Sequence, residues 1–208
     1  MKIGVIQASS QAEKNDILYN IAKETARGHE VINFGCFADE KDTYSYIEIA
    51  LEAGLLLSSG AVNFIVTGCS SGQGMMLACN NMPDVICGYA PTPQDAFLFG
   101  SINDGNAISV PLGLNYGWAG ELNLRYTLSA LFEKPFGTGY PEDDALRKMQ
   151  DTKLLKAIKK QSHINMLRLL DTLDKDIIRK ALQRRNVVDF ITQNGGQQDI
   201  INRIKKDR

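Results

Sequence analysis

The sequence predicts a three-layer α/β sandwich built on a five-stranded parallel sheet, followed by a helical C-terminal extension. Two observations predict this fold class. Short apolar runs alternate with amphipathic segments through the first two-thirds of the chain, and the connections between them are short, as in parallel sheets with helices on both faces. The composition also fits, since 44% of the 208 residues are hydrophobic and can supply a core.

Five apolar segments are the predicted strands. They read KIGVIQ from residue 2, EVINFG from 30, AVNFIVTG from 61, DVICGYA from 84 and NAISVPL from 106. The first helix is expected to open at Ser10, because Ser10 and Glu13 have the spacing of a capping box, and to end before Gly28. Its core side is expected to consist of Ile17, Leu18, Ile21 and Ala22.

Four further helical segments separate or follow the remaining strands. They read TYSYIEIALEAGLLLSSG from residue 43, GMMLACNNM from 74, PTPQDAFLFGS from 91 and YGWAGELNLRYTLSALFE from 116. Helical spacing predicts core positions in the first and last of these segments. They are Ile47, Leu51, Gly54 and Leu55 in the former, and Trp118, Leu122, Tyr126 and Leu131 in the latter.

Composition divides the chain into an α/β domain, residues 1–141, and a helical extension, residues 142–208. The first carries 7 Lys and Arg against 14 Asp and Glu, and the second 16 against 10. A basic tail can indicate nucleic-acid binding, but its basic residues are interleaved with acids and leucines. We therefore expect amphipathic helices, the last at 197–206, that pack on the acidic body or on a partner subunit, and no nucleic-acid partner.

Composition also limits the location and the cofactors. No apolar run is long enough to span a membrane, and the first residues lack the pattern of a signal peptide, so a cytoplasmic protein is expected. The four cysteines have no CxxC spacing and the two histidines lie far apart, which disfavours a metal site or a disulfide framework. GQG at 72–74 is too short for a dinucleotide fingerprint, so no cofactor is expected.

The segment GCSSGQG, residues 68–74, carries the predicted chemistry. It follows the third strand and precedes a helix, and ligands of open α/β sheets bind at the carboxyl ends of strands. Glycines let backbone N–H groups approach a negatively charged oxygen, and a helix N-terminus lowers the pKa of a nearby thiol. Cys69 is therefore a candidate general base, whereas Cys36, Cys79 and Cys87 have the apolar surroundings of buried structural cysteines.

Residues 1–140 resemble the ribose-5-phosphate isomerase B and galactose-6-phosphate isomerase family, in its longer and divergent form. The resemblance rests on CSSGQGMMLACNN, in which Cys69, Gly72, Gly74 and Asn80 match a family motif, and on NDGN at 103–106. It implies a Rossmann-like fold and metal-independent aldose–ketose isomerisation through a cis-enediolate. It also implies Cys69 as the acid/base, Ser71 as hydroxyl donor in place of a family threonine, and the N–H groups of Gly72 and Gly74 as oxyanion donors.

Besides Gly72 and Gly74, five further residues are predicted to bind the substrate. They are Ser9, Ser70, Asn103, Asn106 and Arg125. Three family features are missing: Ala8–Ser9 replaces an Asp-His pair, Ile102 replaces the ring-opening histidine, and the C-terminal arginine cluster has no counterpart. Arg147 and Lys148 are the candidate anion contacts in the tail. The losses concern ring opening and phosphate binding, not the proton-transfer turn.

These losses leave three functions open. The first is a sugar-phosphate isomerase of the ribose-5-phosphate or galactose-6-phosphate type. The second is a ketol-isomerase of an open-chain or deoxy-keto uronate sugar, and the third is a non-catalytic sugar-binding or regulatory protein on the same scaffold. The resemblance also implies a homodimer or homotetramer, for which the apolar helix at 116–132 and the amphipathic tail are candidate interfaces.

Overall fold

The computed structural model describes residues 1–207, so Arg208, the last residue of the predicted extension, lies outside the described residues. Its five strands form one parallel sheet in the order β2-β1-β3-β5-β4. The strands are β1 (Lys2–Ile6), β2 (Glu30–Gly35), β3 (Phe64–Cys69), β4 (Cys87–Tyr89) and β5 (Ala107–Pro111). The predicted fold class is therefore confirmed.

Ten α-helices and three shorter helical turns accompany the sheet in the described residues. The helices of the body are α1 (Asn15–Thr25), α2 (Tyr46–Ser58), α3 (Gln73–Asn80), α4 (Pro93–Leu98) and α5 (Gly120–Leu131). Those of the extension are α6 (Ala145–Ser162), α7 (Met166–Thr172), α8 (Lys175–Leu182), α9 (Arg185–Asn194) and α10 (Gln198–Asp207). The short turns are η1 (Ser9–Lys14), η2 (Phe99–Asn103) and η3 (Glu142–Asp144). No helix within residues 1–207 is long and apolar enough to cross a bilayer.

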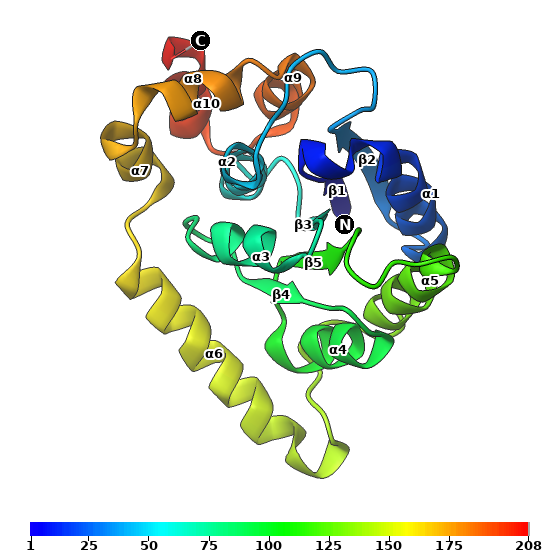
Figure 1. Ribbon diagram of the computed structural model, residues 1–208. Helices are drawn as coiled ribbons and strands as arrows, with labels where there is room; N and C mark the ends of the chain where they lie inside the picture. Colours follow the sequence, from blue (N-terminus) through cyan, green and yellow to red (C-terminus); the bar gives the residue numbers. More distant parts are fainter. Residues whose placement is uncertain (208) are drawn as a thin grey trace.

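Two apolar cores lie on the two faces of the sheet. Helices α1, α4 and α5 cover one face, where Val5, Phe64 and Leu128 are buried together. Helices α2 and α3 cover the other, and α7 to α10 pack outside α2 (Figure 1). Alternate residues of one strand therefore supply both cores, as Ile65 and Val66 do.

The extension contains two kinds of helix. Helices α7 to α10 share their apolar side chains with the core around α2. Helix α6 runs along the edge of the body and contacts it mainly through η2, where the Thr152 hydroxyl donates to the Ile102 carbonyl (Figure 1). Its apolar side chains, such as Leu154 and Ile158, are exposed. The two-domain division stays a prediction.

Some sequence-based details of the helices are wrong. Ser10 and Glu13 form no capping box, because the chain there first makes η1 and α1 begins only at Asn15. The capping box belongs instead to α2. There the Ser45 side chain accepts from the backbone N–H of Glu48, and the Glu48 carboxylate accepts from the backbone N–H of Ser45. Ile17 and Ile47 are exposed as well, since they lie at the margins of their apolar faces.

Three of the four core positions predicted around α5 are also wrong. Trp118, which is 98% exposed, precedes the helix, and Leu122 and Tyr126 point to solvent. Leu131 is buried as predicted, and the other buried positions are Gly120, Leu124, Thr127 and Leu128. Both sets have helical spacing, so α5 has two apolar stripes, and only one faces the sheet.

Candidate active site

The segment Cys69–Gly74, called the cysteine turn below, lies at the carboxyl edge of the sheet. Cys69 is the last residue of β3 and pairs with Pro111, the last residue of β5. Every residue of β3 is buried, and the Cys69 side chain is only 8% exposed. Helix α3 begins three residues after Ser70, so the thiol lies where a strand ends and a helix begins.

Gly72 allows the chain to turn this sharply. Its φ of +77° is in the left-handed region, and a Cβ there would lie 2.8 Å from the Tyr89 ring and 2.9 Å from the carbonyl carbon of Val110. Its carbonyl accepts a 2.6 Å hydrogen bond from the buried Ser109 hydroxyl. No other residue type fits this position without displacing neighbours.

Hydrogen-bond donors of the turn remain uncommitted. The Ser71 hydroxyl oxygen accepts from the N–H of Gln73 at 3.3 Å, which leaves its own proton free to donate. The first N–H groups of α3, including that of Gly74, have no acceptor within the helix. Ser71 and Gly74 are partly exposed, so a ligand oxygen has access to these donors.

Neighbouring loops at the same edge hold the turn in place. The Ser70 carbonyl accepts from the N–H groups of Gly113 and Leu114 at 2.9 and 2.7 Å, and Gln11 donates to the Ser70 hydroxyl at 2.9 Å. Ser9, another predicted site residue, follows β1 at this edge. Its hydroxyl accepts from the N–H of Tyr44 at 2.7 Å, which ties it to the loop before α2.

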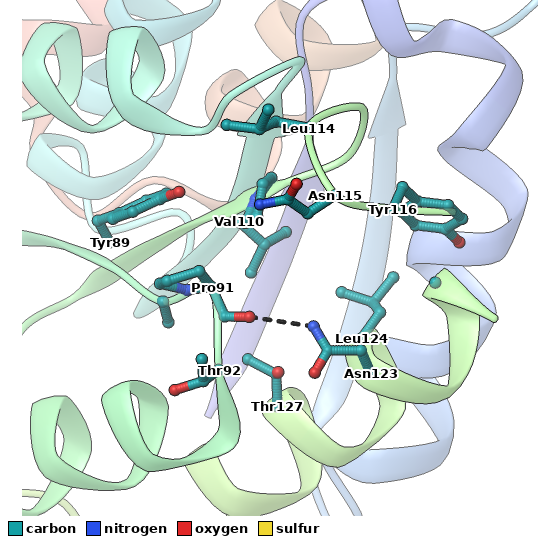
Figure 2. Close-up of a pocket in the computed structure, with 13 residues that line it drawn as sticks. Tyr89, Pro91, Thr92, Val110, Leu114, Asn115, Tyr116, Asn123, Leu124 and Thr127 are labelled. Carbon is teal, nitrogen blue, oxygen red and sulfur yellow. Dashed lines mark hydrogen bonds between the residues drawn. The ribbon is translucent and has the colours of Figure 1, made fainter. Parts of the chain in front are cut away.

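A cavity of about 310 Å³ adjoins the cysteine turn, between the ends of β4 and β5 and one face of α5 (Figure 2). We call it the α5 cavity. Its lining residues are Tyr89, Ala90, Pro91, Thr92, Val110, Pro111, Leu114, Asn115, Tyr116, Gly120, Asn123, Leu124 and Thr127. It shares walls with the turn, because Tyr89 and Val110 contact Gly72 and Leu114 bonds Ser70. Cys69 is not among the residues that line this cavity.

Within one chain, the predicted asparagines do not lie beside Cys69. Asn106 immediately precedes β5, so it is at the amino edge, roughly 16 Å along the strand from Pro111. Its side-chain amide bonds the carbonyl of Asp84 and the N–H of Ile86, which fixes the loop before β4. Asn103 ends η2 and lines a different surface pocket. Their role in substrate binding stays a prediction.

The arginines suggested by the sequence are already paired. Arg125 bonds Glu24 on the surface between α1 and α5, and the pocket beside it contains no other candidate residue. Arg147 bonds two acidic side chains of its own segment, Asp144 and Asp151. Neither guanidinium faces the cysteine turn or the α5 cavity.

Sequence reasoning missed a buried charge cluster at the end of β2, called the arginine cluster below. Arg184, from the turn before α9, donates to Glu52 at 2.7 Å and to Glu40 at 2.9 Å, and it also bonds the Phe34 carbonyl. Arg184 and Glu52 are 132 positions apart, so no local sequence pattern could predict their ion pair. The cluster docks the extension on α2 and on the end of β2.

The pKa values in the arginine cluster indicate a structural role. Burial alone would lower the pKa of Arg184, but Glu52 and Glu40 raise it, so the guanidinium is charged. Burial raises the pKa of Glu52 to about 8, against the attraction of Arg184. It also raises the pKa of the neighbouring Cys36 thiol to about 11, which keeps that thiol protonated and unreactive.

The α5 cavity was also missed, because Asn123 and Thr127 are not among the positions of α5 that were predicted to face the core. Thr127 is 1% exposed, and its hydroxyl has no hydrogen-bond partner. The stripe formed by Leu124, Leu128 and Leu131 is the signal that places Thr127 on the buried face.

Known proteins of one family are similar to this chain. The sequence model of the ribose/galactose isomerase family matches residues 3–120. A 4-deoxy-L-threo-5-hexosulose-uronate ketol-isomerase, whose crystal structure holds a tartrate, is 38% identical with a TM-score of 0.95, and the match covers 100% of this chain and 99% of that one. A ribose-5-phosphate isomerase from Vibrio parahaemolyticus is 36% identical, with a TM-score of 0.94 and the same coverage.

More distant structures share the fold. A type B ribose 5-phosphate isomerase from Trypanosoma cruzi is 20% identical and has a TM-score of 0.65, with 78% of this chain and 100% of that chain covered. A search among curated protein sequences found no significant match. The family match spans more than half of the chain, and it includes the cysteine turn. The chain therefore belongs to the ribose/galactose isomerase family.

Proposed function

We propose that the protein interconverts an aldose and a ketose, with Cys69 moving the proton, and that its substrate is an open-chain sugar acid. One observation carries the assignment of the base: the Cys69 thiol ends a buried strand beside hydrogen-bond donors that have no partner. Of the other three cysteines, Cys79 is fully buried, burial raises the pKa of the Cys36 thiol, and a hydrogen bond with Cys79 together with burial raises the pKa of the Cys87 thiol.

The reaction follows from this placement. The Cys69 thiolate removes the proton from the hydroxyl-bearing carbon beside the aldehyde. The electrons of the broken C–H bond form a C=C bond, and the aldehyde oxygen becomes the oxyanion of an enediolate. The thiol then returns the proton to the former aldehyde carbon, while the proton of the second hydroxyl moves to the first oxygen. No group is gained or lost, so the product is the isomeric ketose.

The turn supports the charged intermediate. The Ser71 hydroxyl and the N–H of Gly74 are placed to donate to the oxyanion, and the N-terminus of α3 adds its partial positive charge. The N–H of Gly72 is the third proposed donor. Rigid glycine geometry keeps these groups oriented before the charge develops, so little reorganisation is needed during the reaction.

Charge pairing supports a substrate without phosphate. Phosphate recognition normally uses Arg in bidentate contacts. Here Arg125, Arg147 and Arg184 are each bound to carboxylates of the same chain. A sugar acid already in the open-chain form needs neither an arginine clamp nor a ring-opening histidine. This agrees with the activity of the 38% identical ketol-isomerase.

A sugar phosphate is the second candidate, because the Vibrio relative of 36% identity is described as a ribose-5-phosphate isomerase. Its phosphate would need cations from elsewhere, and a second copy of the chain is a source. We propose a homo-oligomer for this reason and because Trp118, Leu122 and Tyr126 form an exposed apolar surface.

A substrate comparison tests the proposal. We expect kcat/KM for 4-deoxy-L-threo-5-hexosulose-uronate to exceed that for ribose-5-phosphate and galactose-6-phosphate at least a hundredfold, as followed by NMR of the sugar carbons. The opposite ranking would support the sugar-phosphate isomerase. Binding of the uronate without turnover would support the non-catalytic sugar-binding protein and contradict the proposed catalysis.

A further inference from the structure

The Thr127 hydroxyl is a buried donor without a partner. Thr127 is 1% exposed, and none of the hydrogen bonds of the described residues uses its Oγ1. Gly120, Asn123, Leu124 and Thr127 have the spacing of one helix face, and all four line the α5 cavity. Most buried polar side chains have a partner, so an unpaired one at a cavity wall indicates a missing ligand group.

The N-terminus of α5 adds further donors to the same cavity. The residue before the helix is Ala119, and no side chain caps the helix there. The first N–H groups of a helix have no acceptor within it, and they carry a partial positive charge. Since Gly120 itself lines the cavity, these donors and the Thr127 hydroxyl face one space.

The remaining lining is neutral. Among the described residues, no Lys, Arg, Asp or Glu side chain belongs to the cavity wall. Asn123 donates to the Pro91 carbonyl at 3.0 Å, which fixes the loop after β4 across the cavity from α5, as the dashed line in Figure 2 shows. Asn115 projects from the loop after β5 (Figure 2). Such a wall suits a single carboxylate better than a phosphate dianion, which usually requires Arg or Lys.

The cavity is also next to the proposed chemistry. Its wall residues Tyr89 and Val110 contact Gly72, and Leu114 donates to the Ser70 carbonyl. Cavities of about 300 Å³ are large enough for small ligands. We infer that the α5 cavity binds the carboxylate-bearing, non-reacting end of the sugar acid while the aldehyde end lies at Cys69. This inference rests on the proposed function for the identity of the substrate.

A binding experiment tests the cavity without any turnover. The probes are tartrate and threitol, which share a four-carbon diol centre and differ in having carboxylates or CH₂OH groups at the ends. Calorimetric titration of the wild type is expected to show tartrate binding and at least tenfold weaker threitol binding. Thr127→Val should weaken tartrate binding about tenfold or more, since it removes a hydrogen bond to a charged group, and Thr127→Ser should retain it.

Thr67→Val is the matched control. Thr67 is also a fully buried threonine whose hydroxyl has no partner, but it lies in β3 outside the cavity. Its substitution should leave tartrate affinity unchanged. Equal binding of tartrate and threitol, absence of tartrate binding, or equal losses in Thr127→Val and Thr67→Val would each overturn the inference.

Kinetics separate this inference from the proposed function. With the hexosulose-uronate as substrate, Thr127→Val should raise KM about tenfold and change kcat less than threefold. Turnover with an unchanged KM would overturn the cavity assignment and leave the isomerase intact. Tartrate binding that depends on Thr127, without turnover of the uronate, would support the cavity and contradict the isomerase.

Discussion

Cys36 and Cys69 lie at the carboxyl ends of two parallel strands, β2 and β3, which flank β1, and the chain continues from each into a loop and a helix. Cys69 ends β3 beside hydrogen-bond donors that have no partner. Cys36 follows β2, is fully buried, and lies next to Arg184, which forms ion pairs with Glu40 and Glu52. A thiol at a strand end is therefore not a site in itself. What covers it decides whether it is available for chemistry.

Alanine substitutions of the two cysteines should separate these roles most strongly. Cys69→Ala is expected to lower kcat/KM about a thousandfold, because a positioned general base contributes about 10²- to 10⁴-fold. Cys36→Ala should leave kcat/KM within about threefold. Isomerase assays measure both, with circular dichroism to verify folding. Equal losses of activity would mean that Cys69 is not the base.

Loss of Arg184 should have the largest effect on stability. Above about pH 8, where the Glu52 carboxyl is ionised, Arg184→Ala leaves this fully buried group without its cation, and breaking a buried ion pair in this way costs about 3–5 kcal/mol in the free energy of unfolding. Urea unfolding gives the value. Arg147→Ala is the matched control, because its two ion pairs are exposed and contribute little to stability.

The same cluster offers a check on that interpretation. If the loss in Arg184→Ala comes from uncompensated charge, the triple variant Arg184→Met, Glu52→Gln, Glu40→Gln should regain much of the stability. A destabilisation by Arg184→Ala of less than about 1 kcal/mol, the size of a surface pair, would show that the cluster does not hold the extension.

The pH dependence of stability should also report on the arginine cluster. An unfolded Glu has a pKa near 4.3, whereas burial raises that of Glu52 to about 8. Between these values the folded chain binds the extra proton, so this group favours folding at low pH, and its contribution is lost as pH rises from about 5 to 8. One proton changes the free energy of unfolding by at most about 1.4 kcal/mol per pH unit.

Glu52→Gln should remove this component. Urea unfolding of the wild type and the variant at pH 5, 6, 7 and 8 measures the two slopes, and the exposed Glu30→Gln serves as control. The charged and titratable groups that face Glu52 are Arg184, Glu40, Glu48, Cys36 and Tyr44. A slope that persists in Glu52→Gln would assign the proton to another group.

The strands and the cysteine turn could be predicted from the sequence because their signals are local. EVINFG was predicted as a strand and is β2, residue for residue, since a continuous apolar run between two turns has few alternatives. The glycines of the GCSSGQG segment predict a tight turn, and Gly72 has the positive φ that such a turn uses.

The remaining features depend on contacts between distant segments. Helix α5 has two apolar stripes, and only packing selects Leu124 and Leu128 over Leu122 and Tyr126 for the core. The pair between Arg184 and Glu52 joins the extension to α2, and no periodicity encodes it. Thr127 became a candidate only when its face of α5 was known to be buried.

Arg125 is the residue for which sequence and structure lead to different expectations, and the smallest effect applies to it. It was predicted to bind substrate, but it pairs with Glu24 at a partly exposed position away from the cysteine turn. Exposed pairs of this kind are worth about 0–1 kcal/mol. We therefore expect Arg125→Ala to leave KM and kcat within about twofold, and Glu24→Ala to behave in the same way. A tenfold rise in KM for Arg125→Ala, but not for Glu24→Ala, would mean that Arg125 reaches the substrate of a neighbouring copy.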